Sequence, residues 1–254
     1  MKLKYEITDI QHLVNPKLFR IRALRDIPSI WVKAGYLGGY VENENNLSQE
    51  GDCWIGNDAQ VFGNAWIFGN AKIFDNAKIF GNAKIFGESF VFDTAQVYGY
   101  AQVFDTARVF GNAKIFDNTT IWGHSNAFEN SQIYCSSSVN GYASVSGNAR
   151  ICNHAHIYGY ASVSDDACVT GKTRIFGHAQ VLENARVYGE ASVCGSVIVN
   201  ENMEISGSGK IETLDQIYYY GGVTIFFDRY DELIANGTTA DIEHHKTLAR
   251  LKLA

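Results

Sequence analysis

A six-residue repeat dominates the chain and limits the folds open to it. From Cys53 to Leu214 the units follow one another without insertion or deletion, as in the stretch GNAKIFDNAKIFGNAKIFG. Each unit carries one Ile or Val, from Ile55 to Ile211, and Ala127 is the one exception among these 27 positions. A small residue stands two positions earlier, and 23 of those 27 residues are Ala, Ser or Thr. A fixed period of this kind indicates a repeat architecture.

The spacing inside each unit indicates a short strand followed by a corner. Residues two apart on a strand point to the same side, so the small residue and the Ile or Val share the inner face. The Gly-Asn and Asp-Asn pairs that follow favour turns. A six-residue period does not match the helical periods of about 3.5 or 3.6 residues. The pattern is typical of an all-β fold, the left-handed parallel β-helix, and residues 53–214 predict nine triangular coils, each made of three hexads.

The N-terminal segment has no hexads and predicts a cap. Residues 1–52 contain both prolines of the chain, and Phe19–Leu24 alternates like a strand. A parallel solenoid needs caps because its end strands would otherwise be open templates for aggregation. We therefore predict a small β-rich cap over the first coil.

The C-terminal segment, residues 215–254, predicts a hairpin and a helix. The hairpin is expected over Ile217–Phe227, with its turn at Gly221 and Gly222. Asp241 is a candidate N-cap for a closing helix that ends near Leu253. Both a C-terminal cap and an oligomerisation arm fit this pattern.

Aromatic residues occupy the position after the Ile or Val in the first half of the repeat. Thirteen consecutive units carry one, from Phe62 to Tyr134, and the column then fades. Its parity places this position on the outside. With three hexads in each coil the rings form three ladders, and nine of them are our candidate binding residues: Phe62, Phe80, Tyr98, Phe116, Tyr134, Phe68, Phe86, Phe104 and Trp122.

Two interpretations of these aromatics remain open. The rings can stack on their neighbours one coil away, which adds about 0.5–1.5 kcal/mol per pair beyond burial. Alternatively, the large apolar surface formed by the three ladders is a binding or self-association surface. A symmetric trimer along a parallel axis could not bury all three ladders at once, so stacking has to explain at least part of them.

Proteins of this architecture include acyltransferases and a zinc carbonic anhydrase, so we searched the repeat for both chemistries. An acyltransferase of this kind has a loop thrown out of one coil and a His base, whereas this repeat has no inserted loop. The candidate bases are His154, His156 and His178. His154 and His156 could chelate zinc, but a third ligand is required. We predict no catalytic residue, no metal site and no cofactor.

Composition and charge exclude several function classes. The net charge is −6, which argues against general nucleic-acid binding. No run of eighteen apolar residues is long enough to span a membrane, and the N-terminus lacks the apolar core of a signal peptide. The five cysteines form no CxxC pair, so neither a zinc knuckle nor a disulfide framework is indicated. These features predict a cytoplasmic protein.

The junction between cap and repeat carries a recognisable motif. Gly38-Gly39-Tyr40-Val41, then Asn46-Leu47-Ser48-Gln49-Glu50-Gly51-Asp52-Cys53-Trp54-Ile55, precede the hexads. This pattern resembles a group of bacterial and phage or prophage hexapeptide-repeat proteins, some labelled acyltransferases and some polymer-forming. The resemblance covers about four-fifths of the chain. Because the group has no settled activity, it implies no catalytic residues; a phage setting implies a host-directed binding role, such as blocking a host complex.

We therefore predict a non-catalytic β-helical binding or scaffold protein that acts through protein–protein contacts and forms a homo-oligomer. The uninterrupted repeat and the external aromatic half carry this prediction. The alternative is a CoA-dependent acyltransferase with a site between subunits.

Overall fold

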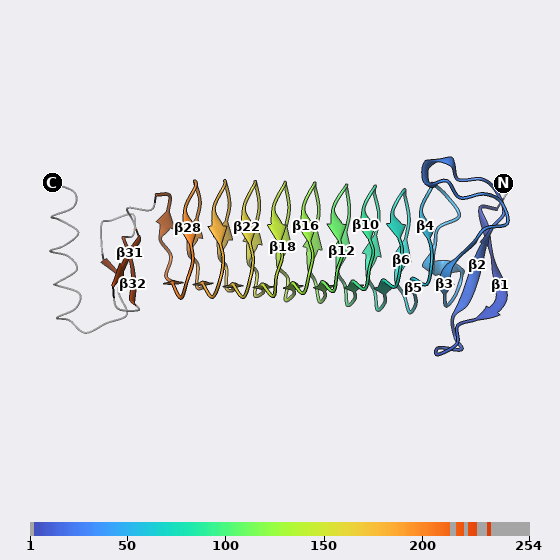
Figure 1. Ribbon diagram of the computed structural model, residues 1–254, viewed down its shortest axis with the longest axis horizontal. Coiled ribbons are helices and arrows are strands. Elements are labelled where there is room, and N and C mark those ends of the chain that lie inside the picture. The colour runs from blue at the N-terminus through green and yellow to red at the C-terminus, as the bar shows by residue number, and fades with distance from the viewer. Residues whose placement is uncertain (1–2, 214–216, 221–222, 228–232, 235–254) are drawn as a thin grey trace.

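The computed structural model describes residues 3–213, 217–220, 223–227 and 233–234. Its repeat is a rod of stacked parallel coils, with the cap at the N-terminal end (Figure 1). Each coil contributes one two-residue strand to each of three parallel sheets, which we call the first, second and third face. This confirms the predicted β-helix.

The strands of the three faces follow the hexads without a break. The first face consists of β4 (Trp54–Ile55), β7 (Lys72–Ile73), β10 (Phe90–Val91), β13 (Arg108–Val109), β16 (Asn126–Ala127), β19 (Ser144–Val145), β22 (Ser162–Val163), β25 (Gln180–Val181) and β28 (Ile198–Val199). The second face consists of β5 (Gln60–Val61), β8 (Lys78–Ile79), β11 (Gln96–Val97), β14 (Lys114–Ile115), β17 (Gln132–Ile133), β20 (Arg150–Ile151), β23 (Cys168–Val169), β26 (Arg186–Val187) and β29 (Glu204–Ile205). The third face consists of β6 (Trp66–Ile67), β9 (Lys84–Ile85), β12 (Gln102–Val103), β15 (Thr120–Ile121), β18 (Ser138–Val139), β21 (His156–Ile157), β24 (Arg174–Ile175), β27 (Ser192–Val193) and β30 (Lys210–Ile211).

The core is a column of small and β-branched side chains. Each strand pairs in register with the strand three hexads later, as Val61 does with Ile79. The Ile, Val and Ala columns are almost wholly buried. At three of the positions where Ser replaces Ala, Ser89, Ser125 and Ser137, the hydroxyl bonds back to the backbone, as Ser89 Oγ does to the carbonyl of Phe86 at 2.8 Å. The small residues leave room for the bulky ones inside a narrow triangular coil.

The corners explain why Gly and Asp share one position of the repeat. Gly111 has φ +66° and Asp93 has φ +57°, so both lie in the left-handed region. Glycine adopts this conformation without strain, and Asp tolerates it better than most residues. The Asp93 carboxylate also accepts a hydrogen bond from the Gly111 N–H of the next coil at 2.9 Å. The corner position therefore favours glycine, which has no Cβ, or aspartate, whose carboxylate adds a hydrogen bond to the next coil along the rod.

The N-terminal cap extends the second face. Its elements are β1 (Tyr5–Gln11), β2 (Phe19–Ala23), η1 (Pro28–Ile30), β3 (Leu37–Val41) and η2 (Glu44–Asn46). Strands β1, β2 and β3 pair antiparallel, and β3 then pairs parallel with β5, placing Val41 beside Val61. An isolated parallel bridge joins Leu47 to Ile67 on the third face. The stacking of coils therefore starts ahead of the first hexad, and the predicted β-rich cap is present.

The glycines of the junction motif are required by close packing. A Cβ on Gly38 would lie 2.5 Å from the carbonyl oxygen of Ile55, and one on Gly39 would lie 2.5 Å from that of Ala59. The buried Asn46 amide donates to the carbonyls of Gly63 and Ala65 at 3.0 and 2.9 Å. The motif thus serves to seat the cap on the first coil.

A buried lysine also joins the cap to the first coil. Lys4 Nζ donates to the Glu50 and Gly51 carbonyls at 3.2 and 3.4 Å and lies 3.0 Å from Cys53 Sγ. Both side chains are fully buried. Burial lowers the pKa of Lys4 and raises the pKa of Cys53, while each group opposes the shift of the other. Both shifts favour an uncharged pair inside the cap.

The C-terminal strands are β31 (Ile217–Tyr220), β32 (Val223–Phe227) and β33 (Leu233–Ile234). Strands β31 and β32 pair antiparallel, which confirms the predicted hairpin pairing, and β32 lies against β29 at the end of the second face. The predicted turn residues and the predicted helix at 241–253 lie outside the described residues.

Candidate functional site

The second-face ladder is a continuous stack of five rings. It comprises Phe62, Phe80, Tyr98, Phe116 and Tyr134, with neighbouring ring centroids 4.7–5.1 Å apart and planes within 4° of parallel. In-register parallel strands impose this geometry because their spacing of about 4.8 Å is close to a stacking distance. The rings predicted to share a column therefore meet face to face.

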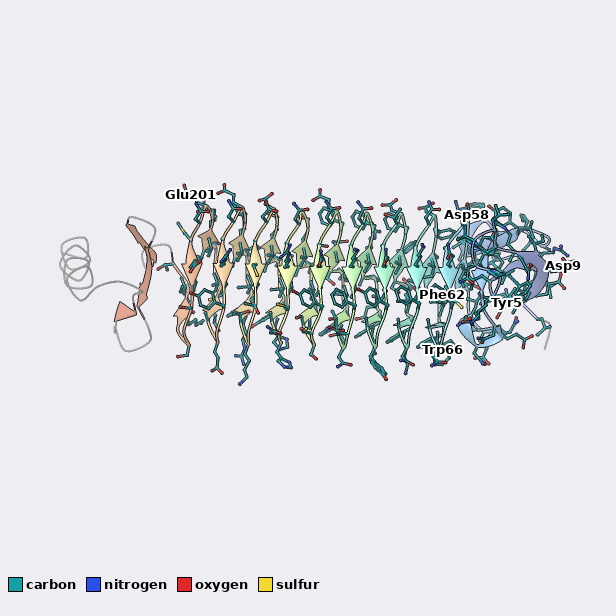
Figure 2. The ribbon with its side chains drawn as sticks, turned by 90° about the horizontal axis from the view of Figure 1, so that it is seen from below. Tyr5, Asp9, Asp58, Phe62, Trp66 and Glu201 are labelled. Atoms are coloured by element: carbon teal, nitrogen blue, oxygen red, sulfur yellow. The ribbon has the colours of Figure 1, made fainter. Side chains whose placement is uncertain are left out.

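The third-face ladder has tryptophans near both ends. Phe68, Phe86 and Phe104 stack at 4.7 and 4.8 Å, and Trp122 follows Phe104 at 5.9 Å. Trp66 packs on Phe68 from the neighbouring outward position at 4.1 Å. Trp66 and Trp122 are 42% and 39% exposed, more than the half-buried phenylalanines between them. Figure 2 places Trp66 at the outer edge of the rod, near the cap.

The first-face ladder is shorter than its sequence column. Phe92, Phe110 and Phe128 stack at 4.9 Å. Phe74 instead packs against the core beside Gly56, where a Cβ would lie 2.5 Å from the Phe74 ring. The missing side chain at Gly56 leaves room for the Phe74 ring beside that glycine, one coil earlier in the same column.

Stacking covers the faces of the rings and leaves edges exposed. Every ring of the thirteen consecutive units is half-buried except the more exposed Trp122. Burial and Asp117 raise the pKa of Tyr98, and burial with Cys152 raises the pKa of Tyr134 to about 12. Both phenols therefore stay protonated at neutral pH, and the ladders present uncharged ring edges to solvent.

A hollow borders the cap end of the third-face ladder. It has a volume of about 570 Å³, and its lining includes Leu47, Asn45, Asn64 and the Trp66 ring. The exposed tryptophan thus stands at the rim of a concave, largely polar surface that the sequence pattern alone did not indicate.

The three candidate histidines do not form one site. His154 lies exposed at a corner after the second face, where both it and Asn153 have positive φ. His156 lies on β21 of the third face. His178 stacks on Tyr160 at 5.0 Å in an exposed corner column that continues through Tyr142 to His124.

His156 does make one contact that could carry chemistry. Its Nδ1 lies 2.7 Å from the hydroxyl of Ser138, one coil earlier on the same face. Burial lowers the pKa of His156, and the nearby Arg174 and His154 lower it further. The neutral ring can accept the Ser138 proton. Ser138 is only 8% exposed, and within the described chain no carboxylate bonds to the His156 ring to orient it.

The described residues contain no group of three or more His, Cys, Asp or Glu side chains that could hold a metal ion. Within the same residues, no helix is long and apolar enough to cross a membrane.

The structure also contains a polar hollow on the second face that sequence analysis missed. It lies over coils six to nine, beyond the end of the second-face ladder, and its lining includes Arg150, Cys168 and Arg186. A signal was present in the sequence: the aromatic column is replaced by Cys152 and Thr170 at the same place. The side chains that line the hollow at this gap determine what it can bind.

Comparison of the chain with protein-family models and with curated proteins finds no match in either.

Proposed function

We propose that this protein is a non-catalytic β-helical scaffold that binds protein partners, further copies of itself included, through its aromatic ladders. The observation that carries the proposal is the row of exposed ring edges on a straight rod, with Trp66 and Trp122 partly exposed on the third face. Tryptophan is enriched among residues that dominate binding energy. The resemblance of the junction motif extends the proposal to partners in a bacterial host, including a complex that the protein blocks.

The third face is the preferred contact. The ring edges of its ladder lie beside uncharged or singly charged side chains such as Gln102, Thr120 and Lys84. A partner that binds this face therefore does not have to remove water from a dense cluster of charges. The rod is also preorganised, because every ring is held by neighbours above or below, and a preformed surface loses little conformational entropy on binding.

The test compares ladder rings with exposed rings elsewhere on the rod. One variant carries Trp66→Ser and Trp122→Ser; the control carries Tyr142→Ser and Tyr160→Ser, which removes two exposed rings from a corner. Mass in solution by light scattering and partner capture from host extract are measured for both, with circular dichroism to verify folding. We expect the ladder variant alone to lose self-association or a captured partner. Unchanged mass and capture in a folded ladder variant, extended by Phe80→Ser, Tyr98→Ser and Phe116→Ser, would contradict the proposal.

The Ser138–His156 contact favours one second candidate, a CoA-dependent acyltransferase. In that case His156 would act as the base, as His residues do in acyl transfer. Incubation with acetyl-CoA and a panel of amines and sugars separates the two functions. Acyl transfer that disappears in His156→Ala or His178→Ala would replace the scaffold proposal with this one.

A further inference from the structure

The polar hollow on the second face results from a gap in the aromatic column. After Tyr134 the column continues with Cys152 and Thr170, and the next ring is Tyr188. Cys152 is nearly buried and its Sγ bonds to Thr170 Oγ1 at 3.2 Å. The resulting hollow has a volume of about 570 Å³, within the range of about 300–1,000 Å³ typical of small-molecule sites.

Cys168 lines this hollow between two arginines. On β20, β23 and β26 the outward residues Arg150, Cys168 and Arg186 stand in register on adjacent strands. Two strand spacings separate the arginines, about 10 Å between their Cα atoms. The thiol side chain is much shorter than either arginine, so the two guanidinium groups can converge over it.

Burial, Cys152 and the two arginines all act on the Cys168 thiol. Burial raises the pKa of this thiol, Cys152 adds to the rise, and Arg186 and Arg150 oppose it. Arg186 pairs with Glu204 at 3.7 Å, but both side chains are about half exposed or more, so this ion pair is weak. Arg150 makes no ion pair within the described residues.

The remaining carboxylate of the hollow is already engaged. Asp166 accepts a hydrogen bond from Asn148 Nδ2 at 2.9 Å and lies toward the corner, away from the centre of the column. Thr170 and Asn184 line the hollow on either side of the arginines. The lining thus combines two arginines that flank a thiol with the carboxylates of Asp166 and Glu204 and with hydroxyl and amide groups.

We propose that the hollow over Cys168 binds the oxyanion of a small polar ligand, a carboxylate or a phosphate, between Arg150 and Arg186. Guanidinium groups bind both oxyanions through paired, charge-assisted hydrogen bonds. The surrounding amide and hydroxyl groups suit a ligand that also carries hydroxyls. This site lies outside the three ladders and is independent of the proposed scaffold function.

Alkylation of Cys168 provides a direct probe of the site. Iodoacetate and iodoacetamide react alike: the thiolate sulfur forms a bond to carbon, iodide leaves, and the thiol proton passes to the buffer. Only iodoacetate carries a carboxylate. Cys135 is the internal control, because it is also part-exposed but lies 3.5 Å from the Asp117 carboxylate.

The measurement is the ratio of iodoacetate to iodoacetamide rate at each cysteine, read by peptide mass spectrometry at low salt. We expect this ratio to be about tenfold higher at Cys168 than at Cys135. The arginines beside Cys168 attract the negatively charged iodoacetate, whereas the Asp117 carboxylate beside Cys135 repels it. Arg150→Gln and Arg186→Gln should each lower the ratio at Cys168 several-fold. Arg108→Gln, on the first face, should leave it unchanged.

Two further arms distinguish the oxyanions. Inorganic phosphate and acetate are each tested for protection of Cys168 against the neutral iodoacetamide, with chloride at equal ionic strength as the reference. Protection by one anion beyond chloride, lost in Arg150→Gln, assigns the ligand class. Equal reagent ratios at Cys168 and Cys135, or a ratio that Arg150→Gln leaves intact in the folded protein, would overturn the proposal.

Discussion

At the scale of single residues, the corners determine how closely coils can stack. Gly147 and Gly63 have nearly the same φ, +63° and +65°. A Cβ on Gly147 would lie 2.5 Å from the Asp165 backbone nitrogen, whereas one on Gly63 would lie 3.3 Å from the nearest atom, the Gly81 carbonyl oxygen. Comparing substitutions at these two glycines therefore distinguishes the cost of backbone strain, which both share, from the cost of a steric clash between coils, which only Gly147 has.

We expect Gly147→Ala to destabilise the protein more than Gly63→Ala. Both variants place Ala in the left-handed region, at a cost of about 1 kcal/mol. Only Gly147→Ala also forces two backbones apart, which should add at least about 1 kcal/mol. Urea unfolding followed by circular dichroism measures both. Equal losses would mean that conformational strain alone accounts for the glycine at these corners.

The raised pKa of Tyr134 makes a second prediction at this scale. The phenol titrates near 10.0 when unfolded and at about 12 when folded, chiefly because burial disfavours its charged form. Its contribution to stability is complete below 10.0 and is lost as pH rises through the folded value. Tyr134→Phe should therefore be less sensitive to alkali than the natural protein. Unfolding midpoints at neutral pH and near the folded pKa test this; parallel decline of both proteins contradicts it.

At the scale of elements, each ladder couples coils through its rings. A ring inside the second-face ladder stacks on two neighbours, whereas Phe62 at its end stacks only on Phe80. Phe74 shows how a ring depends on the residue one coil away. Gly56 offers no ring to stack on, and Phe74 packs against the core beside that glycine. The ladder is therefore a cooperative feature of neighbouring strands.

We predict that Phe80→Leu destabilises the protein more than Phe62→Leu. Leucine retains apolar burial, so the difference reports mainly the second stack, about 0.5–1.5 kcal/mol. Denaturant unfolding of each variant gives the two losses. If the end and interior positions lose the same amount, ring stacking contributes nothing measurable and only burial matters.

At the scale of the whole molecule, each coil interacts only with its neighbours, as in other solenoids. Every strand of the repeat pairs with the strands one coil before and one coil after it, apart from those at the ends. Removing one full coil should therefore preserve register, inward parity and the three faces.

Deletion of residues 95–112, one coil, should leave a folded protein with modestly lower stability. Deletion of 95–103, half a coil, should prevent folding beyond the cut, because corner residues would then fall on strands. Circular dichroism and the unfolding midpoint distinguish the two. A half-coil deletion that folds as well as the full-coil deletion would show that hexad phase is not what holds the rod together.

The residue pattern was sufficient to predict the β-helix, its N-terminal cap and the three aromatic columns, because a strict six-residue period produces stacked strands whichever side chains occupy the outward positions. The contacts between outward side chains, in contrast, were found only in the folded protein. It packed Phe74 beside Gly56, joined Ser138 to His156 and placed Cys168 between two arginines. These contacts join residues of adjacent coils and depend on side-chain size and rotamer at each level. A repeat pattern does not encode such local differences, so the candidate sites became visible only when the coils were stacked.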